Sequence, residues 1–220
     1  MPLDAEFDDV VRGGAGERPI QRFFERHPHL LIESNYVLAD TVVSQLRLGT
    51  EFRADFAFIE PTSGPTYLHL IELESPSLAI FNANDEFTAR FNRAAQQVRD
   101  WTLWGARHQA ELSSLFGPLY YGTGETATGF FVVKSLLVVG RRAFISNVRR
   151  RERFESLSLE RGGFCEVRTY DGFREKIEFK FRTDPENEAG VRCVWYRGRR
   201  FSERPLRTRP RTDPSEERRP

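Results

Sequence analysis

The sequence predicts an α/β fold in which a mixed β-sheet is flanked by helices. Segments rich in β-branched and aromatic residues are interleaved with segments whose apolar residues recur at helical spacing. Their order along the chain is helix, antiparallel strands, helix, strand, helix, strand, helix. This order is typical of a sheet that carries helices on its faces.

Composition sets broad limits on the chain. Its 220 residues suffice for one mixed domain and a tail. A net charge of +1 gives no overall attraction to nucleic acid, so such binding would need a local basic patch. Only three of the 33 basic residues are lysine. This arginine bias suits a phosphate-rich partner, and genome composition explains it equally well.

The sequence argues against a protein stabilised by disulfides or cysteine-bound metal, and against a secreted or membrane protein. Cys165 and Cys193 provide neither a metal-binding spacing nor a disulfide framework. The sequence shows no signal peptide and no apolar run long enough to cross a membrane. We therefore expect a cytoplasmic protein with no membrane partner.

Composition also divides the chain into three parts. Residues 1–16 are acidic and then glycine-rich, and are interpreted as a leader. Residues 17–182 form the predicted domain. Residues 183–220 are rich in Arg and Pro and are expected to be disordered, apart from a short strand suggested at 191–196.

The first half of the domain is predicted to be one helix followed by three strands. A helix covers 17–27, with Pro19 in its first turn and Pro28 ending it. Strands at 36–48 and 53–59 form a hairpin around Gly49. A turn at 61–65 leads to a third strand at 67–74, which pairs with the second.

The second half is predicted to alternate helices and strands. The clearest helix covers 85–107, because apolar residues recur there with helical period. A loop is expected at 117–129. The remaining elements are a buried strand at 130–139, a charged helix at 146–160, a strand at 164–169 and a helix at 172–179.

Three acidic residues lie within otherwise apolar strands. Glu72 and Glu74 share a strand face with Leu68 and Leu70, because side chains alternate along a strand. Pairing with the neighbouring strand can bring Asp55 beside Glu72. Clustered carboxylates repel one another unless a cation neutralises them, and oxygen ligands suit Mg²⁺, with Mn²⁺ as a substitute. The alternative is an edge strand with one solvated face.

Two helices contribute further candidates. At 100° per residue, Gln97 and Arg90 fall on one flank of the helix and can point over the carboxylates, whereas Gln96 faces solvent. Glu17 projects toward the core side of the first helix. The alternatives are a surface amide for Gln97 and a first-turn acid that interacts with the helix dipole for Glu17.

These motifs resemble those of PD-(D/E)xK nucleases, in which an Asp precedes Glu-x-Lys on the next strand and a helix carries Gln. Here the motifs are Asp55, Glu72-Leu-Glu74 and the string QVRDW that begins at Gln97. More narrowly, the chain resembles the Shedu-type nucleases that defend bacteria against phage. The supporting strings are ERPIQRFFERHPHLL at 17–31, VVGRR at 138–142 and VRTYD at 167–171.

The resemblance implies a restriction-endonuclease-like fold and a Mg²⁺-dependent endonuclease or nickase that acts on DNA, in a homo-oligomer. Asp55 and Glu72 would bind the metal, and Glu74 would position or deprotonate water. Gln97 would orient water or phosphate, and Glu17 would complete the outer shell of the metal. Arg90 would counter the charge of the phosphate. Five further arginines are candidate clamps on the DNA backbone: Arg141, Arg142, Arg149, Arg150 and Arg151. For these five, the alternative is a solvated helix face.

One departure from the family pattern bears on activity. Glu74 stands where these nucleases usually carry a lysine that orients or activates the attacking water. Lys134, on a later strand, is a candidate replacement. Two alternatives therefore stay open, namely a catalytically inactive relative that binds nucleic acid or protein, and a structural assembly subunit.

Overall fold

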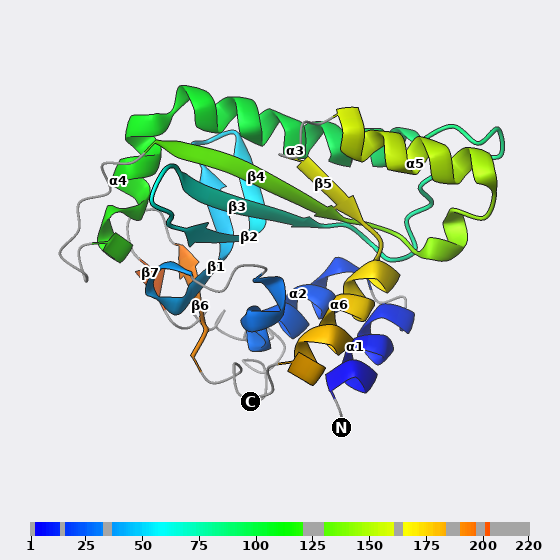
Figure 1. The fold of residues 1–220 in the computed structure, drawn as a ribbon, viewed down its shortest axis with the longest axis horizontal. Coiled ribbons are helices and arrows are strands. Elements are labelled where there is room, and N and C mark those ends of the chain that lie inside the picture. Colours follow the sequence, from blue (N-terminus) through cyan, green and yellow to red (C-terminus); the bar gives the residue numbers. More distant parts are fainter. Residues whose placement is uncertain are drawn as a thin grey trace, which may run out of the picture.

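The sheet is mixed and lies between two layers of helices. In the computed structural model its strand order is β5-β4-β3-β2-β1-β6-β7 (Figure 1). The structure describes residues 3–13, 16–32, 37–120, 130–160, 165–183, 190–196 and 201–202. The predicted fold class, a mixed sheet flanked by helices, is confirmed.

The strands form an antiparallel centre with parallel additions on both sides. β1 (Thr41–Leu48), β2 (Phe52–Glu60) and β3 (Thr66–Leu73) form an antiparallel meander. β4 (Phe131–Val138) runs parallel to β3, and β5 (Cys165–Arg168) runs parallel to β4. On the other side, β6 (Arg192–Tyr196) is parallel to β1, and β7 (Phe201–Ser202) is antiparallel to β6.

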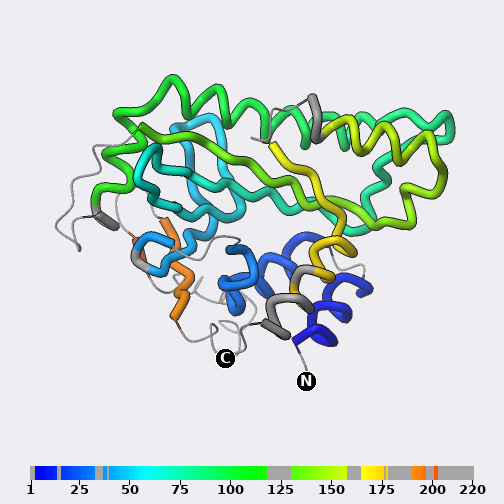
Figure 2. The backbone as a smooth tube through the Cα atoms, viewed as in Figure 1, coloured from blue at the N-terminus to red at the C-terminus, as the bar shows by residue number. Residues whose placement is uncertain are grey.

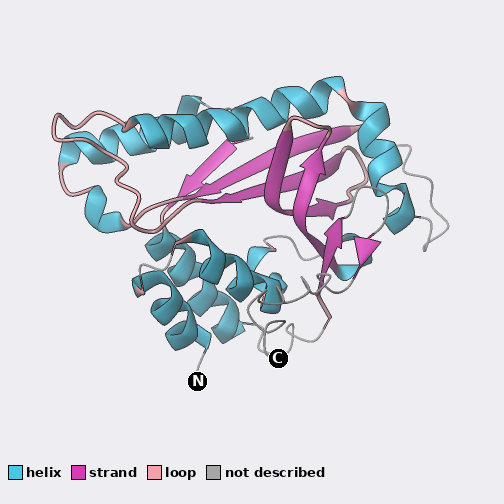
Figure 3. Cartoon of the chain, turned by 180° about the vertical axis from the view of Figure 1, so that it is seen from behind, coloured by secondary structure: helices cyan, strands magenta, loops and turns pink. Residues whose placement is uncertain are grey.

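The two faces of the sheet carry different helices (Figures 1 and 3). One face packs against α3 (Ala89–Arg107), α4 (Gln109–Tyr120) and α5 (Val148–Glu160). The other packs against α1 (Leu3–Arg12), α2 (Glu17–Arg26) and α6 (Tyr170–Thr183). Short 3-10 helices occupy Pro28–Leu31, Leu38–Asp40 and Arg142–Phe144. No helix in the described part of the chain is long and apolar enough to cross a membrane.

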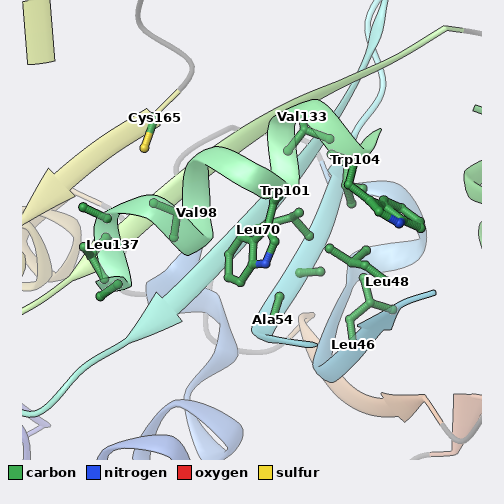
Figure 4. Close-up of a cluster of buried hydrophobic side chains, with 14 of the residues drawn as sticks. Leu46, Leu48, Ala54, Leu70, Val98, Trp101, Trp104, Val133, Leu137 and Cys165 are labelled. Carbon is green, nitrogen blue, oxygen red and sulfur yellow. The ribbon is translucent and has the colours of Figure 1, made fainter. Parts of the chain in front are cut away.

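The α3 side holds the larger apolar core. The buried stripe of α3, which includes Val98 and Trp101, lies over Leu70 and Leu137 of the sheet (Figure 4). Helical periodicity correctly indicated this stripe, because residues three and four apart share one face of a helix. Near the end of α3, Gly105 lets the helix approach β4 closely. α3 is therefore held at a fixed height above the strands that carry the candidate acids.

An aromatic cluster fills the opposite face. Phe7 of α1 packs against Phe23 and Phe24 of α2 and Phe173 of α6, with ring centroids 5.4–6.3 Å apart. Helices from the beginning of the chain and from near residue 175 thus lie side by side (Figure 2). Within the segment interpreted as a leader, residues 3–12 form helix α1, which packs into the fold through Phe7 and Val11.

Two predicted element boundaries were wrong. β1 begins at Thr41 after a 3-10 turn in which Asp40 is left-handed (φ 45°), so the strand expected from residue 36 starts later, and residue 36 itself lies outside the described residues. α3 begins at Ala89, not at 85. The hydroxyl of Thr88 accepts a hydrogen bond from the Phe91 amide and caps the helix, while Asp85 is left-handed (φ 59°).

Helix α4 was not predicted from the sequence. Residues 117–120 belong to this helix and not to the predicted loop, whose residues 121–129 lie outside the described residues. α5 starts at Val148 and α6 spans 170–183, so one is slightly shorter and the other longer than expected. The short strand suggested at 191–196 is confirmed as β6, and the sheet therefore continues beyond residue 182.

Candidate functional site

The side-chain alternation of two central strands breaks at the same place. Val43 and Leu46 of β1 both belong to the α3-side core although they are three residues apart, and so do Ala54 and Ala57 of β2. In a regular strand only residues two apart share a face. The break lies at Gln45, which is left-handed (φ 56°), and at its cross-strand neighbour Asp55. A strained backbone at such a position is typical of a functional site.

Asp55 lies where β2 separates from β3. Regular pairing of these strands ends at Phe56 and Ile71. Beyond it, the Asp55 carboxylate takes the place of a backbone acceptor, because its Oδ2 accepts a hydrogen bond from the Leu73 amide at 2.9 Å. Its Oδ1 accepts another from Gln45 Nε2 at 2.8 Å. Burial nevertheless raises the pKa of Asp55 above its usual value.

Glu72 is the most perturbed acid of the site. It faces α3, where Gln97 Nε2 donates a hydrogen bond to its Oε1 at 2.9 Å. Its other oxygen, Oε2, is buried and has no hydrogen-bond partner among the described residues. Burial, followed by the charges of Asp55 and Glu74, raises the pKa of Glu72 to about 9. The geometry expected for Gln97 is therefore present.

Glu74 belongs to an ionic bridge between three elements. Arg90 of α3 contacts Glu74 Oε2 and Glu17 Oε1, each at 3.1 Å. Glu17 comes from the first turn of α2 and is half exposed, whereas the Glu74 side chain is only 18% exposed. Burial raises the pKa of Glu74, and Arg90 opposes this shift. The structure thus brings Glu17 and Arg90 to the acids.

A second set of polar residues supports Asp55 from behind and was missed from the sequence. Besides Gln45, Gln21 of α2 donates to Ser44 Oγ at 2.9 Å and to the Asp55 carbonyl at 3.4 Å. Ser44 donates in turn to Glu25, which also accepts from the indole of Trp195 in β6. Gln45 gives no signal of its own in the sequence, because a polar residue near a hairpin turn is ordinary.

Asp55, Glu72 and Glu17 line one wall of an open cleft of about 690 Å³. Its other walls are the turn of the β1–β2 hairpin around Gly49 and the exposed flank of α3. Gln96, expected to face solvent, is exposed and donates to Asp100 at 2.7 Å on this flank. A ligand larger than a water molecule can therefore reach Asp55 and Glu72.

The acids fit a hard divalent cation with few protein ligands. No three aspartate, glutamate, histidine or cysteine side chains of the described residues are grouped closely enough to hold a metal ion. Mg²⁺, however, usually keeps several waters and binds through one or two carboxylates. The unpartnered Oε2 of Glu72 and the raised pKa values of Glu72 and Asp55 are what a missing positive charge would produce.

Lys134 does not replace the missing lysine. Lys134 of β4 pairs with His69 of β3, three residues before the level of Glu72, which is about 10 Å along the strand. Its ammonium group lies 3.5 Å above the Tyr67 ring and 3.6 Å from Glu60. These partners lie at the opposite end of β3, so the suggested role is wrong.

Several of the predicted clamp arginines already have carboxylate partners. Arg141 makes a two-pronged ion pair with Asp171, which raises the pKa of Arg141. Arg142 pairs with Glu175 at 2.7 Å. Arg150 pairs with Asp85 and also donates to two backbone carbonyls. Of the six arginines predicted to contact phosphate, only Arg90 contacts a carboxylate of the site within the described part of the chain. The other five do not line the cleft.

The fold and the site together define an α/β protein with a cluster of carboxylates where two central strands diverge. The sequence model of the family described as Shedu protein SduA, C-terminal, matches residues 14–173, which is more than half of the chain. The chain therefore belongs to this family. A search of curated proteins found no match.

Proposed function

We propose that the chain is a Mg²⁺-dependent nuclease of the PD-(D/E)xK type that cuts DNA in anti-phage defence. The observation that carries this proposal is the buried, unpartnered Glu72 oxygen beside Asp55, at the point where β2 leaves β3. Membership of the Shedu family supports the defence role.

Asp55 and Glu72 would hold the cation, with water completing its coordination. Bound there, Mg²⁺ supplies Lewis-acid stabilisation of a phosphoryl oxygen and lowers the pKa of water. Asp55 is kept in place for this by Gln45 and by the Leu73 amide. Gln97 holds Glu72 through Oε1, and Oε2 has no hydrogen-bond partner among the described residues.

Glu74 would accept the proton of the attacking water, and Arg90 would offset the negative charge of the phosphate. The raised pKa of Glu74 suits a carboxylate that accepts a proton from the attacking water. Arg90 brings to this position the positive charge that a lysine provides in the related nucleases, and Glu17 holds Arg90 from the other side. The ion pair therefore compensates for Glu74 in the lysine position.

A catalytically inactive binding module is the second candidate. It is favoured because no lysine among the described side chains lies beside the acids, and because Lys134 lies at the far end of the sheet. Such a module would bind DNA or protein without cleaving phosphodiester bonds. The resemblance also leads us to propose a homo-oligomer, which light scattering of the purified protein tests.

Supercoiled plasmid incubated with the protein and Mg²⁺ or Mn²⁺ tests the nuclease. We expect nicking or linearisation that EDTA stops. Glu72→Gln and Asp55→Asn should each lower the rate by at least about 100-fold, because each would remove a metal-binding charge.

Glu60→Gln is the matched control, since this carboxylate also belongs to β2 but pairs with His69 and Lys134. It should cleave at nearly the wild-type rate. Folded protein that binds Mg²⁺ calorimetrically but leaves plasmid, linear DNA and RNA intact would replace the nuclease with the binding module.

A further inference from the structure

Three arginines line the same cleft as Asp55 and Glu72. Arg47 and Arg53 come from the β1–β2 hairpin, and Arg93 comes from α3. All three are exposed. None forms an ion pair with a residue in the described part of the chain, in contrast to Arg141, Arg142 and Arg150. Their guanidinium groups are therefore available to a ligand.

The hairpin pair is unusual by itself. Arg47 and Arg53 are directly opposite in the antiparallel register, so their Cα atoms are about 5 Å apart. Like charges directly opposite each other destabilise a strand pair. An anion held between the two side chains would relieve this repulsion, and guanidinium groups match the geometry of phosphate oxygens.

The charges of the cleft differ between its floor and its rim. Besides the three arginines, five carboxylates line it, so its formal charge is negative when all of them are ionised. A divalent cation at Asp55 and Glu72 cancels this excess. A polyanion would then meet a neutral floor, a hairpin wall on which two arginines outnumber Glu51, and an α3 wall on which Asp100 balances Arg93.

We propose that Arg47, Arg53 and Arg93 bind the nucleic-acid backbone on the two sides of the scissile phosphate. The hairpin arginines hold one phosphate between them, and Arg93 contacts a second across the cleft. This inference rests on the proposed nuclease function, because it takes Asp55 and Glu72 as the reaction centre. The DNA contacts would therefore lie on the β1–β2 hairpin and α3, and not on α5 and the segment after β4, where the sequence predicted them.

Binding of a fluorescein-labelled 30-bp DNA duplex tests the proposal, with Ca²⁺ in place of Mg²⁺ so that binding is measured without cleavage. Fluorescence anisotropy over a KCl series gives the Kd and its salt dependence. Arg47→Ala/Arg53→Ala should weaken binding roughly tenfold, and Arg93→Ala roughly threefold. Each lost phosphate contact should lower the slope of log K against log salt by about 1. EDTA should weaken binding by the wild type.

Arg99→Ala is the matched control, because Arg99 is an exposed arginine of α3 that does not line the cleft. It should bind as the wild type does. If the double alanine variant does not fold by circular dichroism, the double glutamine variant keeps the aliphatic stems and replaces it. Folded variants with the Kd and salt slope of the wild type would overturn the proposal, as would a wild type that does not bind the duplex.

The two proposals fail in different ways. If the wild type binds DNA but never cleaves it, and the arginine variants lose binding, the phosphate contacts are supported and the nuclease is contradicted. A wild type that cleaves plasmid while the cleft variants bind normally would support the nuclease and contradict the phosphate contacts.

Discussion

At the scale of single residues, the site depends on acids whose ionised forms are disfavoured. Glu72 has its pKa raised to about 9 by burial and by the charges of Asp55 and Glu74, and the pKa of Glu74 is raised as well. A group whose pKa rises on folding stabilises the protein below its unfolded pKa. This contribution is lost as the pH rises through the folded value. For Glu72 the window extends from about 4.5 to about 9.

Glu72→Gln should therefore stabilise the metal-free protein at pH 8 and change little at pH 4. We expect a higher melting temperature at pH 8, where each kcal/mol corresponds to about 2–4 °C for a chain of this size. Mg²⁺ should raise the melting temperature of the wild type at pH 8 and leave that of Glu72→Gln unchanged. Differential scanning fluorimetry in EDTA and in Mg²⁺ measures both effects. A wild type that melts at the same temperature with and without metal would argue against the cation site.

At the scale of elements, α3 carries residues from the core to the cleft. Its apolar stripe fixes its position over the sheet, and the flank next to that stripe presents Arg90, Arg93 and Gln97. The height of α3 over β4 depends on Gly105. A Cβ added there would lie 2.3 Å from Val133 Cγ2, which is far below a van der Waals contact.

Gly105→Ala should therefore destabilise the protein by about 1–3 kcal/mol, as overpacking does. The same change should cost clearly less in a Val133→Ala background, where the clashing methyl groups are gone. Urea unfolding of the four proteins in this double-mutant cycle gives the coupling energy. Additive effects in the cycle would show that Gly105 does not set the helix–strand distance.

At the scale of the whole molecule, the sheet is completed by chain segments that are distant in sequence. β6 covers the edge of β1 and bonds to the network behind Asp55 through Trp195 and Glu25. α1 and α6 close the other face. The candidate acids therefore lie on a scaffold to which residues 3–13 and 190–196 both contribute.

A chain that ends at residue 190 should be less stable than one that ends at residue 202, because it exposes the edge of β1. Open edges also template strand pairing between molecules, so the shorter chain should associate at high concentration. Urea midpoints and size-exclusion profiles of the two chains measure this difference. Equal midpoints and elution volumes would mean that β6 adds nothing to the sheet.

Much of the site could be predicted because its residues are polar or charged where the neighbouring positions are apolar. Asp55, Glu72 and Glu74 are charged residues in apolar strands, and Gln97 and Arg90 share a helix flank, so local periodicity was enough to group them. Gln45, Arg47 and Arg53 were missed, because a polar residue near a hairpin turn is ordinary in sequence. The ion pairs of Arg141 and Arg142 could not be predicted from local pattern, because their partners Asp171 and Glu175 lie about 30 residues away.

The sequence by itself determined the fold class, the central hairpin, the apolar stripe of α3 and the acids of the site, since these follow from periods of 2 and 3.6 residues. Only the tertiary structure decided which arginines are free, where Lys134 lies and how β6, α1 and α4 complete the fold. Those outcomes depend on contacts between distant segments, in which a carboxylate or a strand edge finds its partner through packing rather than through local pattern.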